Sequence, residues 1–329
     1  MNGYITLDYE LFMGDNTGTP EMCLIKPMNH LTAMLDKYGV KTNVFVDATY
    51  LLKMRELKDR FPQLQKDYES VTNHVKRLDA EGHAIQLHLH PQWCYSSFNG
   101  SKWVLDKDHY KLSDMPLEEQ KKLIHEGVQL LNSLVTRKVT AFRAGGYSVE
   151  NFPDLYDTFL EEGIVADSSV LRGEHYESKY QTYDYRNIPA LSSYRFSTSH
   201  KVKDDDGRMI EYPLSVKITP FFMYLVSRIV KRKDGKKAKK KWGDGVGIGY
   251  PGGKQQMILT NFKMLTSMKS ISSYIEYGYY LEDVYKYSVS HFKGDEFVII
   301  GHPKCLGEYN IGFLESFIIN HPEISYHLL

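Results

Sequence analysis

Apolar residues follow two spacings along the chain, one typical of strands and one typical of helices. Residues 3–8 form a short alternating run, and the β-branched run from Val40 to Val46 follows later, so both predict strands. Between them, residues 22–38 carry leucine and methionine at helical spacing, and Gly39 ends that run. The chain therefore begins with a strand, a helix and a second strand.

The same alternation continues through most of the chain. The further predicted elements are helix 63–81, strand 83–88, helix 116–136, strand 139–143, helix 151–162, strand 164–167, helix 264–290, strand 296–300 and helix 309–320. Strands that alternate with helices in this way are typical of an α/β fold with a parallel sheet, either open or closed into a barrel.

The alternation is weakest between about residues 170 and 262. This stretch holds two short strand candidates, 188–190 and 210–216, and an apolar helix, 219–231. We find no internal repeat and no linker that divides the chain. We therefore predict one domain, residues 1–329, with a long insertion at about 170–262 that lies over the C-terminal ends of the strands.

Composition narrows the classes of function. The chain has 41 Lys or Arg and 41 Asp or Glu, so no global charge favours nucleic acid as a partner. Cys23, Cys94 and Cys305 are too few and too far apart for a disulfide framework or a zinc knuckle. The first residues are typical of a strand and not of a signal peptide, and no apolar run could span a bilayer, so we expect a cytoplasmic protein.

The first predicted strand ends in two carboxylates. Asp8 and Glu10 are two positions apart, so both side chains face the same side if the strand continues that far. Such a pair could hold a metal ion, or one carboxylate could hold it while the other takes a proton. A strand-end cap or a salt bridge explains the pair equally well.

A histidine pair ends another predicted strand. His88 and His90 face one side if the chain is extended, whereas His88 and Gln92 share a face if the chain turns helically after Pro91. Histidines at such spacing are a usual way to hold zinc or a similar ion. Both registers fit the sequence.

Two further strand ends complete the set. Arg143 stands before a Gly-Gly pair and could orient a carboxylate or form a structural ion pair. His302 follows the apolar run 297–300 and is well placed as a general acid, or as a buried core histidine. Asp167 ends the strand candidate 164–167, where it could tune an imidazole or cap a turn. We predict that these strand ends share one site at the mouth of the barrel.

A basic run follows the apolar helix 219–231. Residues 231–241 are mostly lysine, which is typical of a solvated loop. An apolar helix beside basic residues is also typical of a peripheral element that touches anionic lipid, so residues 219–241 are a candidate membrane contact. The same lysines could bind the phosphates of a nucleotide- or lipid-linked substrate.

Taken in this order, the segments around Asp8, His88, Arg143 and His302 resemble the motifs of the polysaccharide deacetylase family, the NodB-homology metal-dependent carbohydrate esterases. The resemblance runs from Thr6 to Pro303 and lies in the order of the motifs more than in their exact letters. It implies a distorted (β/α)7-type barrel with a divalent metal at its mouth. In that family a carboxylate activates water, the metal polarises an acetamide carbonyl, and a histidine protonates the leaving amine.

The resemblance implies a role for each matching residue. Asp8 would be the general base, Arg143 would hold it, His302 would be the general acid, and Asp167 would be the carboxylate that tunes that acid. The tryptophan often found after the Asp167 motif is not present in this sequence.

The resemblance also implies a metal-ligand set. Glu10 would be the metal carboxylate, and His88 would be the first histidine ligand. Gln92 stands at the position of the second histidine, and a neutral amide is a poor substitute for imidazole around zinc. His90 would then complete the site, or metal binding would be weak. Zinc is the expected ion, with cobalt, nickel or iron as alternatives.

We therefore expect a metal-dependent hydrolase that removes an acyl group, such as acetyl, from an N-acylated sugar. The expected substrate is a nucleotide- or lipid-linked precursor in surface polysaccharide biosynthesis. One alternative is a non-catalytic glycan-binding or scaffold barrel with a decayed metal site, and another is a hydrolase of a non-sugar C–N amide bond. Because a binding protein needs neither a base nor an acid, the presence of both favours an enzyme.

Overall fold

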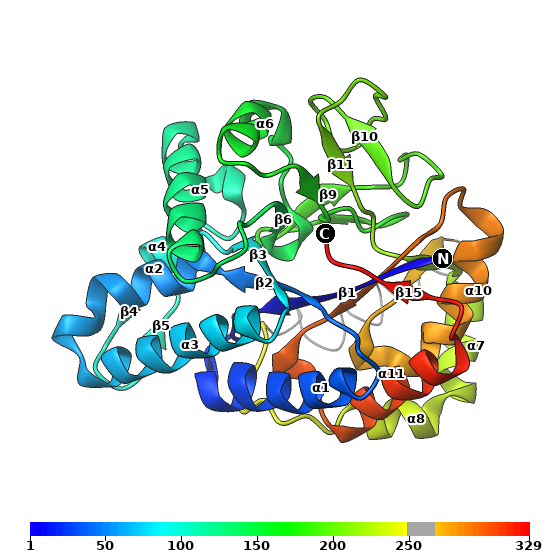
Figure 1. Cartoon of the computed structure of the whole chain (residues 1–329), viewed down its shortest axis with the longest axis horizontal. Coiled ribbons are helices and arrows are strands. Elements are labelled where there is room, and N and C mark those ends of the chain that lie inside the picture. Colours follow the sequence, from blue (N-terminus) through cyan, green and yellow to red (C-terminus); the bar gives the residue numbers. More distant parts are fainter. Residues whose placement is uncertain (249–266) are drawn as a thin grey trace.

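The computed structural model describes residues 1–248 and 267–329, and a mostly parallel sheet runs through its centre (Figure 1). The strands of this sheet are β1 (Asn2–Tyr9), β2 (Asn43–Asp47), β3 (Ala84–Leu89), β6 (Ala141–Ala144), β7 (Ala166–Asp167), β10 (Tyr194–Phe196), β11 (Met209–Glu211), β14 (Glu296–Gly301) and β15 (Ser325–Tyr326). Their order is β10-β11-β7-β6-β3-β2-β1-β14, and β15 also pairs with β1. Among the strands described, only β10 and β11 pair antiparallel within this sheet.

Helices cover the sheet. They are α1 (Lys26–Asp36), α2 (Ala48–Leu57), α3 (Pro62–Ala80), α4 (Gln92–Tyr95), α5 (Leu117–Asn132), α6 (Phe152–Glu161), α10 (Leu281–His291) and α11 (Glu308–Asn320). In Figure 1, α1, α3 and α11 lie along the lower side of the sheet, and α5 and α6 lie along the upper side. The helix α3 shows why these segments pack as helices: it buries Leu64, Val71, Val75 and Leu78, which lie on one face at the 3.6-residue period.

Smaller elements complete the described chain. They are the pairs β4 (Ser97–Phe98) with β5 (Trp103–Val104), β8 (His175–Glu177) with β9 (Thr182–Asp184), and β12 (Val216–Pro220) with β13 (Met268–Ser272); the helices α7 (Phe221–Val230) and α8 (Arg232–Ala238); and the short turns η1 (Glu21–Ile25), η2 (Lys58–Arg60), η3 (Leu112–Asp114), η4 (Gly145–Tyr147), η5 (Ile275–Tyr280) and η6 (Pro303–Cys305). Of the helices in the described ranges, none combines the length and the apolar character that crossing a membrane requires.

Strand register brings distant residues to one edge of the sheet. In the parallel pair of β1 and β14, Leu7 lies opposite Gly301, so Asp8 and His302 leave their strands at the same edge. On the other side of β1, His88 of β3 lies opposite Arg143 of β6. Because all these strands are parallel, their carboxyl ends meet, as predicted from the sequence.

Among the described residues, no strand-to-strand ladder closes the sheet into the expected (β/α)7-type barrel. Within the described ranges, the hydrogen-bonded path ends at β10 on one side and at β14 on the other. The free edge of β14 is covered by the chain that follows β11, where Ser215 N–H donates to Val298 O at 3.2 Å and Ser215 Oγ accepts from Val298 N–H at 2.9 Å. The coarser prediction, an α/β fold around a mostly parallel sheet, is confirmed.

Several local predictions were wrong. The helix expected over 264–290 begins only at Leu281, because Met268–Ser272 pairs with β12 as a strand and η5 follows it; residues 264–266 lie outside the described ranges. Residues 188–190 form no strand, and Pro189 lacks the N–H that a ladder needs.

Two helices were not expected. The helix α2 follows β2 directly, and the Asp47 side chain caps it by accepting from Tyr50 N–H at 3.3 Å. Part of the lysine run expected as a loop forms α8. The division into one domain with an insertion at 170–262 stays a prediction, and residues 249–262 of that insertion lie outside the described ranges.

Candidate metal centre and acid–base site

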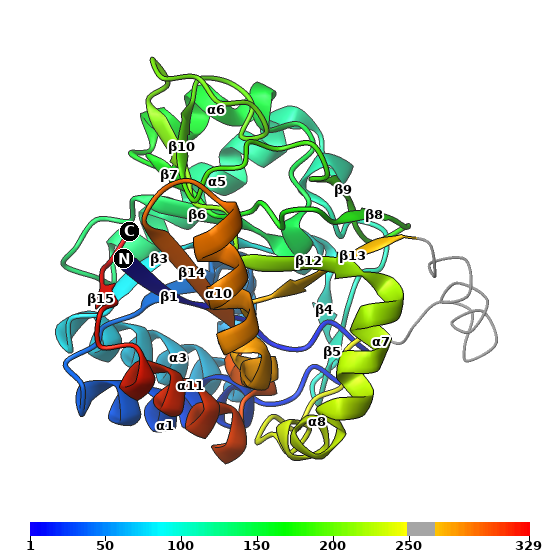
Figure 2. The same ribbon diagram turned by 90° about the vertical axis from the view of Figure 1, so that its right-hand side faces the viewer.

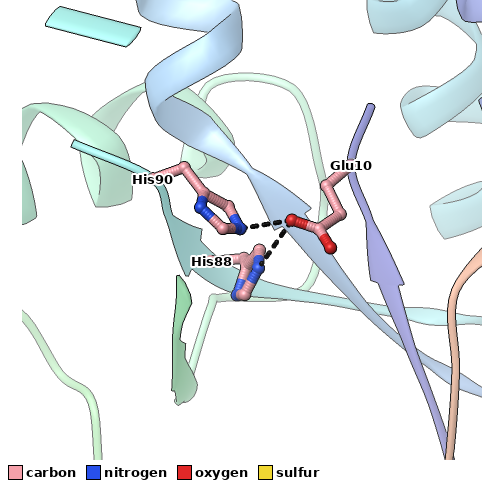
Figure 3. Close-up of side chains that lie close together, drawn as sticks. All are labelled: Glu10, His88 and His90. Atoms are coloured by element: carbon pink, nitrogen blue, oxygen red, sulfur yellow. Dashed lines mark ion pairs between the residues drawn. The ribbon is translucent and has the colours of Figure 1, made fainter. Parts of the chain in front are cut away.

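Glu10, His88 and His90 bring three metal-binding groups together at the carboxyl ends of β1 and β3 (Figure 3). One donor atom from each residue lies within 4.8 Å of the others. Glu10 Oε2 is 3.4 Å from His88 Nε2 and forms a closer ion pair with His90 Nε2. These three atoms are buried, and in the described part of the chain they face one another without another hydrogen-bond partner. Buried donor atoms in this arrangement fit a cation.

The opposite ring nitrogen orients His88. Its Nδ1 lies 2.8 Å from the Arg143 carbonyl oxygen, to which it donates. This hydrogen bond leaves Nε2 directed at Glu10, the arrangement usual for a metal-binding histidine. Burial would lower the pKa of His88, but Asp8 and Glu10 raise it to about 8. The surrounding carboxylates therefore favour positive charge at this position.

Gln92 lies behind His90. Its side-chain nitrogen is 3.4 Å from His90 Nδ1, and its buried Oε1 has no hydrogen-bond partner in the described ranges. Turning the amide by half a rotation would let Oε1 accept from Nδ1–H, because the two amide atoms are interchangeable in shape. Gln92 is therefore placed to orient His90, and the two donors that face Glu10 come from His88 and His90. The register with both histidines on one side is the observed one.

Gly145 allows β6 to approach this histidine. A Cβ atom at Gly145 would lie 2.5 Å from Leu89 O and 2.8 Å from His90 Nδ1. The next two residues, Gly146 and Tyr147, have φ values of 58° and 61°. The glycine pair therefore serves a tight turn packed on His90.

Arg143 holds Asp8 in a buried ion pair. Its Nη1 donates to Asp8 Oδ1 at 2.6 Å, and Nη2 donates to Thr6 Oγ1 and Ser168 Oγ, both at 2.9 Å. Its Nε donates to Ser168 O at 2.8 Å. Burial would raise the pKa of Asp8, but Arg143 and His88 lower it below its usual value. Asp8 is thus held as a carboxylate with a fixed orientation.

His302 lies near both carboxylates at the carboxyl end of β1, those of Asp8 and Glu10. Its Nε2 is 3.5 Å from Asp8 Oδ2 and 3.7 Å from Glu10 Oε1. On the other side of the ring, Glu276 Oε1 accepts from Nδ1 at 2.6 Å. Burial would lower the pKa of His302, but Glu276 and Asp8 raise it. The side chain of His302 is 18% exposed, compared with 4% for Asp8, so a substrate would meet the site from the His302 side.

Asp167 does not occupy the position expected for it. It accepts from Ser169 Oγ at 2.7 Å and lies against Glu211, its partner in the β7–β11 register. No hydrogen bond or ion pair joins it to His302 in the described ranges, and Glu276 contacts that histidine instead. The physical reason is that Ser169 and Glu211 contact the buried Asp167 carboxylate, whereas Glu276 of η5 contacts His302.

Two residues of the site were missed. Glu276 lies in a tyrosine-rich segment with no local signal of a site. Lys304 donates from its buried Nζ to Glu10 Oε1 and to Leu11 O, both at 2.8 Å. Burial would raise the pKa of Glu10, but Lys304 and His90 lower it well below its usual value. Lys304 stands two residues after His302, the same spacing as in the Asp8 and Glu10 pair, and that spacing was an available signal.

Comparisons with known proteins give fold-level similarity alone. No protein-family model matches the chain, and no curated protein matches it significantly. A protein from Mycobacterium smegmatis described under the name polysaccharide deacetylase aligns over 100% of this chain and 93% of its own, with 11% identity and a TM-score of 0.47. A 4-alpha-glucanotransferase from Thermococcus litoralis aligns over 99% of this chain and 39% of its own, with 11% identity and a TM-score of 0.48. An allantoinase aligns over 98% and 84%, with 10% identity and a TM-score of 0.46.

Proposed function

We propose that this protein is a metal-dependent hydrolase that cleaves the amide bond of an N-acylated sugar. The observation that carries the proposal is the convergence of three buried donor atoms, from Glu10, His88 and His90, beside the Asp8 carboxylate and the His302 imidazole. One carboxylate oxygen and two imidazole nitrogens suit zinc, cobalt, nickel or iron. A bound ion of this kind would polarise the amide carbonyl and lower the pKa of water.

Asp8 and His302 each carry out one proton transfer. Asp8 takes a proton from the water whose oxygen adds to the carbonyl carbon, and Arg143 keeps Asp8 ionised and aimed. His302 then donates its Nε2 proton to the amide nitrogen as the C–N bond breaks, which yields a carboxylic acid and an amine. Glu276 accepts from Nδ1 and so keeps the imidazolium oriented. Lys304 holds the carboxylate of Glu10 in place.

An aromatic surface supports a sugar as the substrate. Tyr274 stacks on the His302 ring with a centroid distance of 5.8 Å, and Tyr277 meets Tyr274 edge to face at 6.0 Å. Tyr277 is 52% exposed, so its ring is available to the apolar face of a sugar. The narrower expectation, a nucleotide- or lipid-linked precursor of a surface polysaccharide, stays a prediction, as does the cytoplasmic location.

Metal content and amide turnover together test the proposal. Plasma mass spectrometry on the purified protein is expected to find close to one transition-metal ion per chain, and His88→Ala is expected to lose it. His125→Ala is the matched control, because His125 is an exposed histidine paired with Glu162 on the surface. Asp8→Asn is expected to keep the metal and lose the release of acetate from N-acetylated oligosaccharides.

Two results would overturn the proposal. A protein that binds no metal after reconstitution would favour the non-catalytic glycan-binding alternative. Turnover that persists in Asp8→Asn would remove Asp8 from the role of base. A panel of non-sugar amides assayed in parallel identifies the third alternative, hydrolysis of another C–N bond.

A further inference from the structure

One helix near the site exposes an apolar stripe to solvent. In α7, Phe222, Met223, Val226, Ile229 and Val230 are all exposed, with Ile229 at 73% and Val230 at 76%. At 3.6 residues per turn these five positions fall within an arc of about 120°. The opposite face is anchored to the protein through the buried Phe221 side chain and the hydrogen bond of Ser227 with the Tyr280 hydroxyl at 3.0 Å.

Basic side chains follow directly on this stripe. Residues 228–241 contain nine Lys or Arg and one Asp, in a chain whose formal net charge is zero. The exposed members are Arg228, Arg232, Lys233, Lys236, Lys237, Lys239, Lys240 and Lys241. In the described part of the chain, Lys231 is the one residue of this group that pairs with a carboxylate, that of Asp283 at 3.0 Å. Within residues 1–248 and 267–329, the remaining positive charge of this group therefore has no carboxylate partner.

The two helices form one continuous surface. In both views, α8 continues from the end of α7 at one end of the molecule (Figures 1 and 2). From the structure and charge of this surface, we propose that residues 221–241 dock the protein on a bilayer that contains anionic lipid. The exposed stripe of α7 would enter the boundary between head groups and acyl chains, and the lysines of α8 would contact the anionic head groups.

Charge complementarity favours an anionic bilayer over a protein as the partner of this surface. An apolar stripe alone would also fit a protein partner, because proteins bury such faces against one another. The exposed Lys and Arg side chains beside the stripe favour a partner that carries many negative charges. A bilayer with anionic lipid has an apolar interior that can bury the stripe of α7 and negatively charged head groups that can bind the basic side chains. It therefore matches both features of this surface.

The surface is connected to the candidate site. The side-chain amide of Asn310 donates to Ala238 O in α8 at 3.1 Å and to Glu276 O at 2.9 Å. The chain that leaves α8 donates from Trp242 N–H to Leu306 O at 2.9 Å, two residues after Lys304. Docking would therefore hold the site at the membrane surface, where an acylated sugar carried on a lipid is presented.

Vesicle flotation with the full chain tests the proposal. The protein is expected to float with vesicles of phosphatidylcholine and phosphatidylglycerol, to stay behind with phosphatidylcholine alone, and to dissociate as the salt concentration rises. Ile229→Asp is expected to weaken partition at least about tenfold, since it puts a charge in the apolar stripe. The triple variant Lys236→Gln, Lys237→Gln and Lys239→Gln is expected to weaken it on the order of 100-fold at low salt.

The matched control is Ile319→Asp, a substitution of another exposed apolar residue, in α11. It is expected to float like the unchanged protein, and a thermal melt confirms that each variant is folded. Equal loss in Ile319→Asp, or unchanged flotation in the triple variant, would overturn the proposal. Binding to soluble polyglutamate without flotation would also overturn it and would favour an acidic protein. Release from vesicles by inorganic phosphate, at matched ionic strength with chloride, would show a phosphate site instead.

Discussion

One carboxylate oxygen of Glu276 accepts two hydrogen bonds from His302, from ring Nδ1 at 2.6 Å and from the backbone N–H at 2.7 Å. The double contact fixes the ring and assigns a proton to Nδ1. The second nitrogen, Nε2, is then left facing Asp8. The arrangement explains how a histidine that follows a buried strand can be held as a proton donor at the edge of the sheet.

Glu276→Gln tests this contact. The amide removes the negative charge that raises the pKa of His302, so we expect kcat on an amide substrate to fall about 10- to 100-fold while metal content is unchanged. His302→Ala should lower kcat further, by about 10²- to 10⁴-fold, again with little change in metal. Turnover and plasma mass spectrometry are measured on the same samples. If His302→Ala lost metal and activity equally, His302 would belong to the metal-binding group.

Gln92 offers a test of which residues face the metal. Since its amide lies against His90 Nδ1 at 3.4 Å, Gln92→His is expected to leave metal affinity unimproved. Gln92→Ala is expected to weaken affinity about 10- to 100-fold, because His90 loses the partner that orients it. Competition with a chromophoric chelator measures both constants. Tighter binding in Gln92→His would mean that residue 92 reaches the ion.

The Arg143 and Asp8 pair makes a prediction about stability. Arg143 is fully buried, and Arg143→Met would leave the Asp8 carboxylate in the core without its cation. We expect a loss of about 3–5 kcal/mol in the free energy of unfolding, measured in urea. The double variant Asp8→Asn, Arg143→Met should recover part of that loss, because the uncompensated charge is gone. A double variant as unstable as Arg143→Met would show that the lost hydrogen bonds to Thr6 and Ser168 dominate.

The Asp167 and Glu211 pair predicts a pH dependence of stability. Burial, with the Asp167 carboxylate adding to it, holds the pKa of Glu211 well above its usual value, so the native protein keeps a proton that the unfolded chain releases. A raised acid pKa gives stability that is complete below about pH 4.5 and is lost as pH rises toward the native pKa. The loss is up to about 1.4 kcal/mol per pH unit for one proton.

Glu211→Gln removes this proton uptake. The amide can still accept from Val170 N–H and can donate to Asp167, so the variant is expected to gain stability relative to the unchanged protein as pH rises from about 5 to about 8. Urea unfolding at several pH values measures the difference, and the exposed Glu118→Gln serves as the surface control. A difference that does not change with pH would mean that Glu211 is ionised in the native protein.

Much of the site could be predicted because its signals are local. The strand patterns around Asp8, His88 and His302 are short apolar runs, and the polar residues that follow them mark the strand ends. Parallel strands put their carboxyl ends at one edge, so the meeting of these three residues followed from the alternation of strands and helices. The two-residue spacing allowed His88 and His90 to lie on one side, but the structure was needed to choose this register over the one with Gln92.

Other parts of the site have no local signal. Glu276 reaches His302 across 26 residues, and Lys304 reaches Glu10 across 294. The segment before α10 was predicted as helix from its own composition, yet pairing with β12 made it a strand and a turn, and that turn carries Glu276. The resemblance in motif order pairs Asp167 with His302, but motif order does not determine which carboxylate contacts the histidine, and that carboxylate is Glu276.

The amino-acid sequence by itself determined the α/β class and the strand ends that carry the candidate site residues, because both depend on periodicity within a few residues. The roles of base, acid and metal ligand are what the resemblance in motif order implies. Only the tertiary structure decided that Glu276 supports His302, that Lys304 pairs with Glu10, that Gln92 lies behind His90, and that Asp167 pairs with Glu211. These contacts depend on sheet order and on which side chains compete for one buried position, and such long-range packing has no period in the sequence.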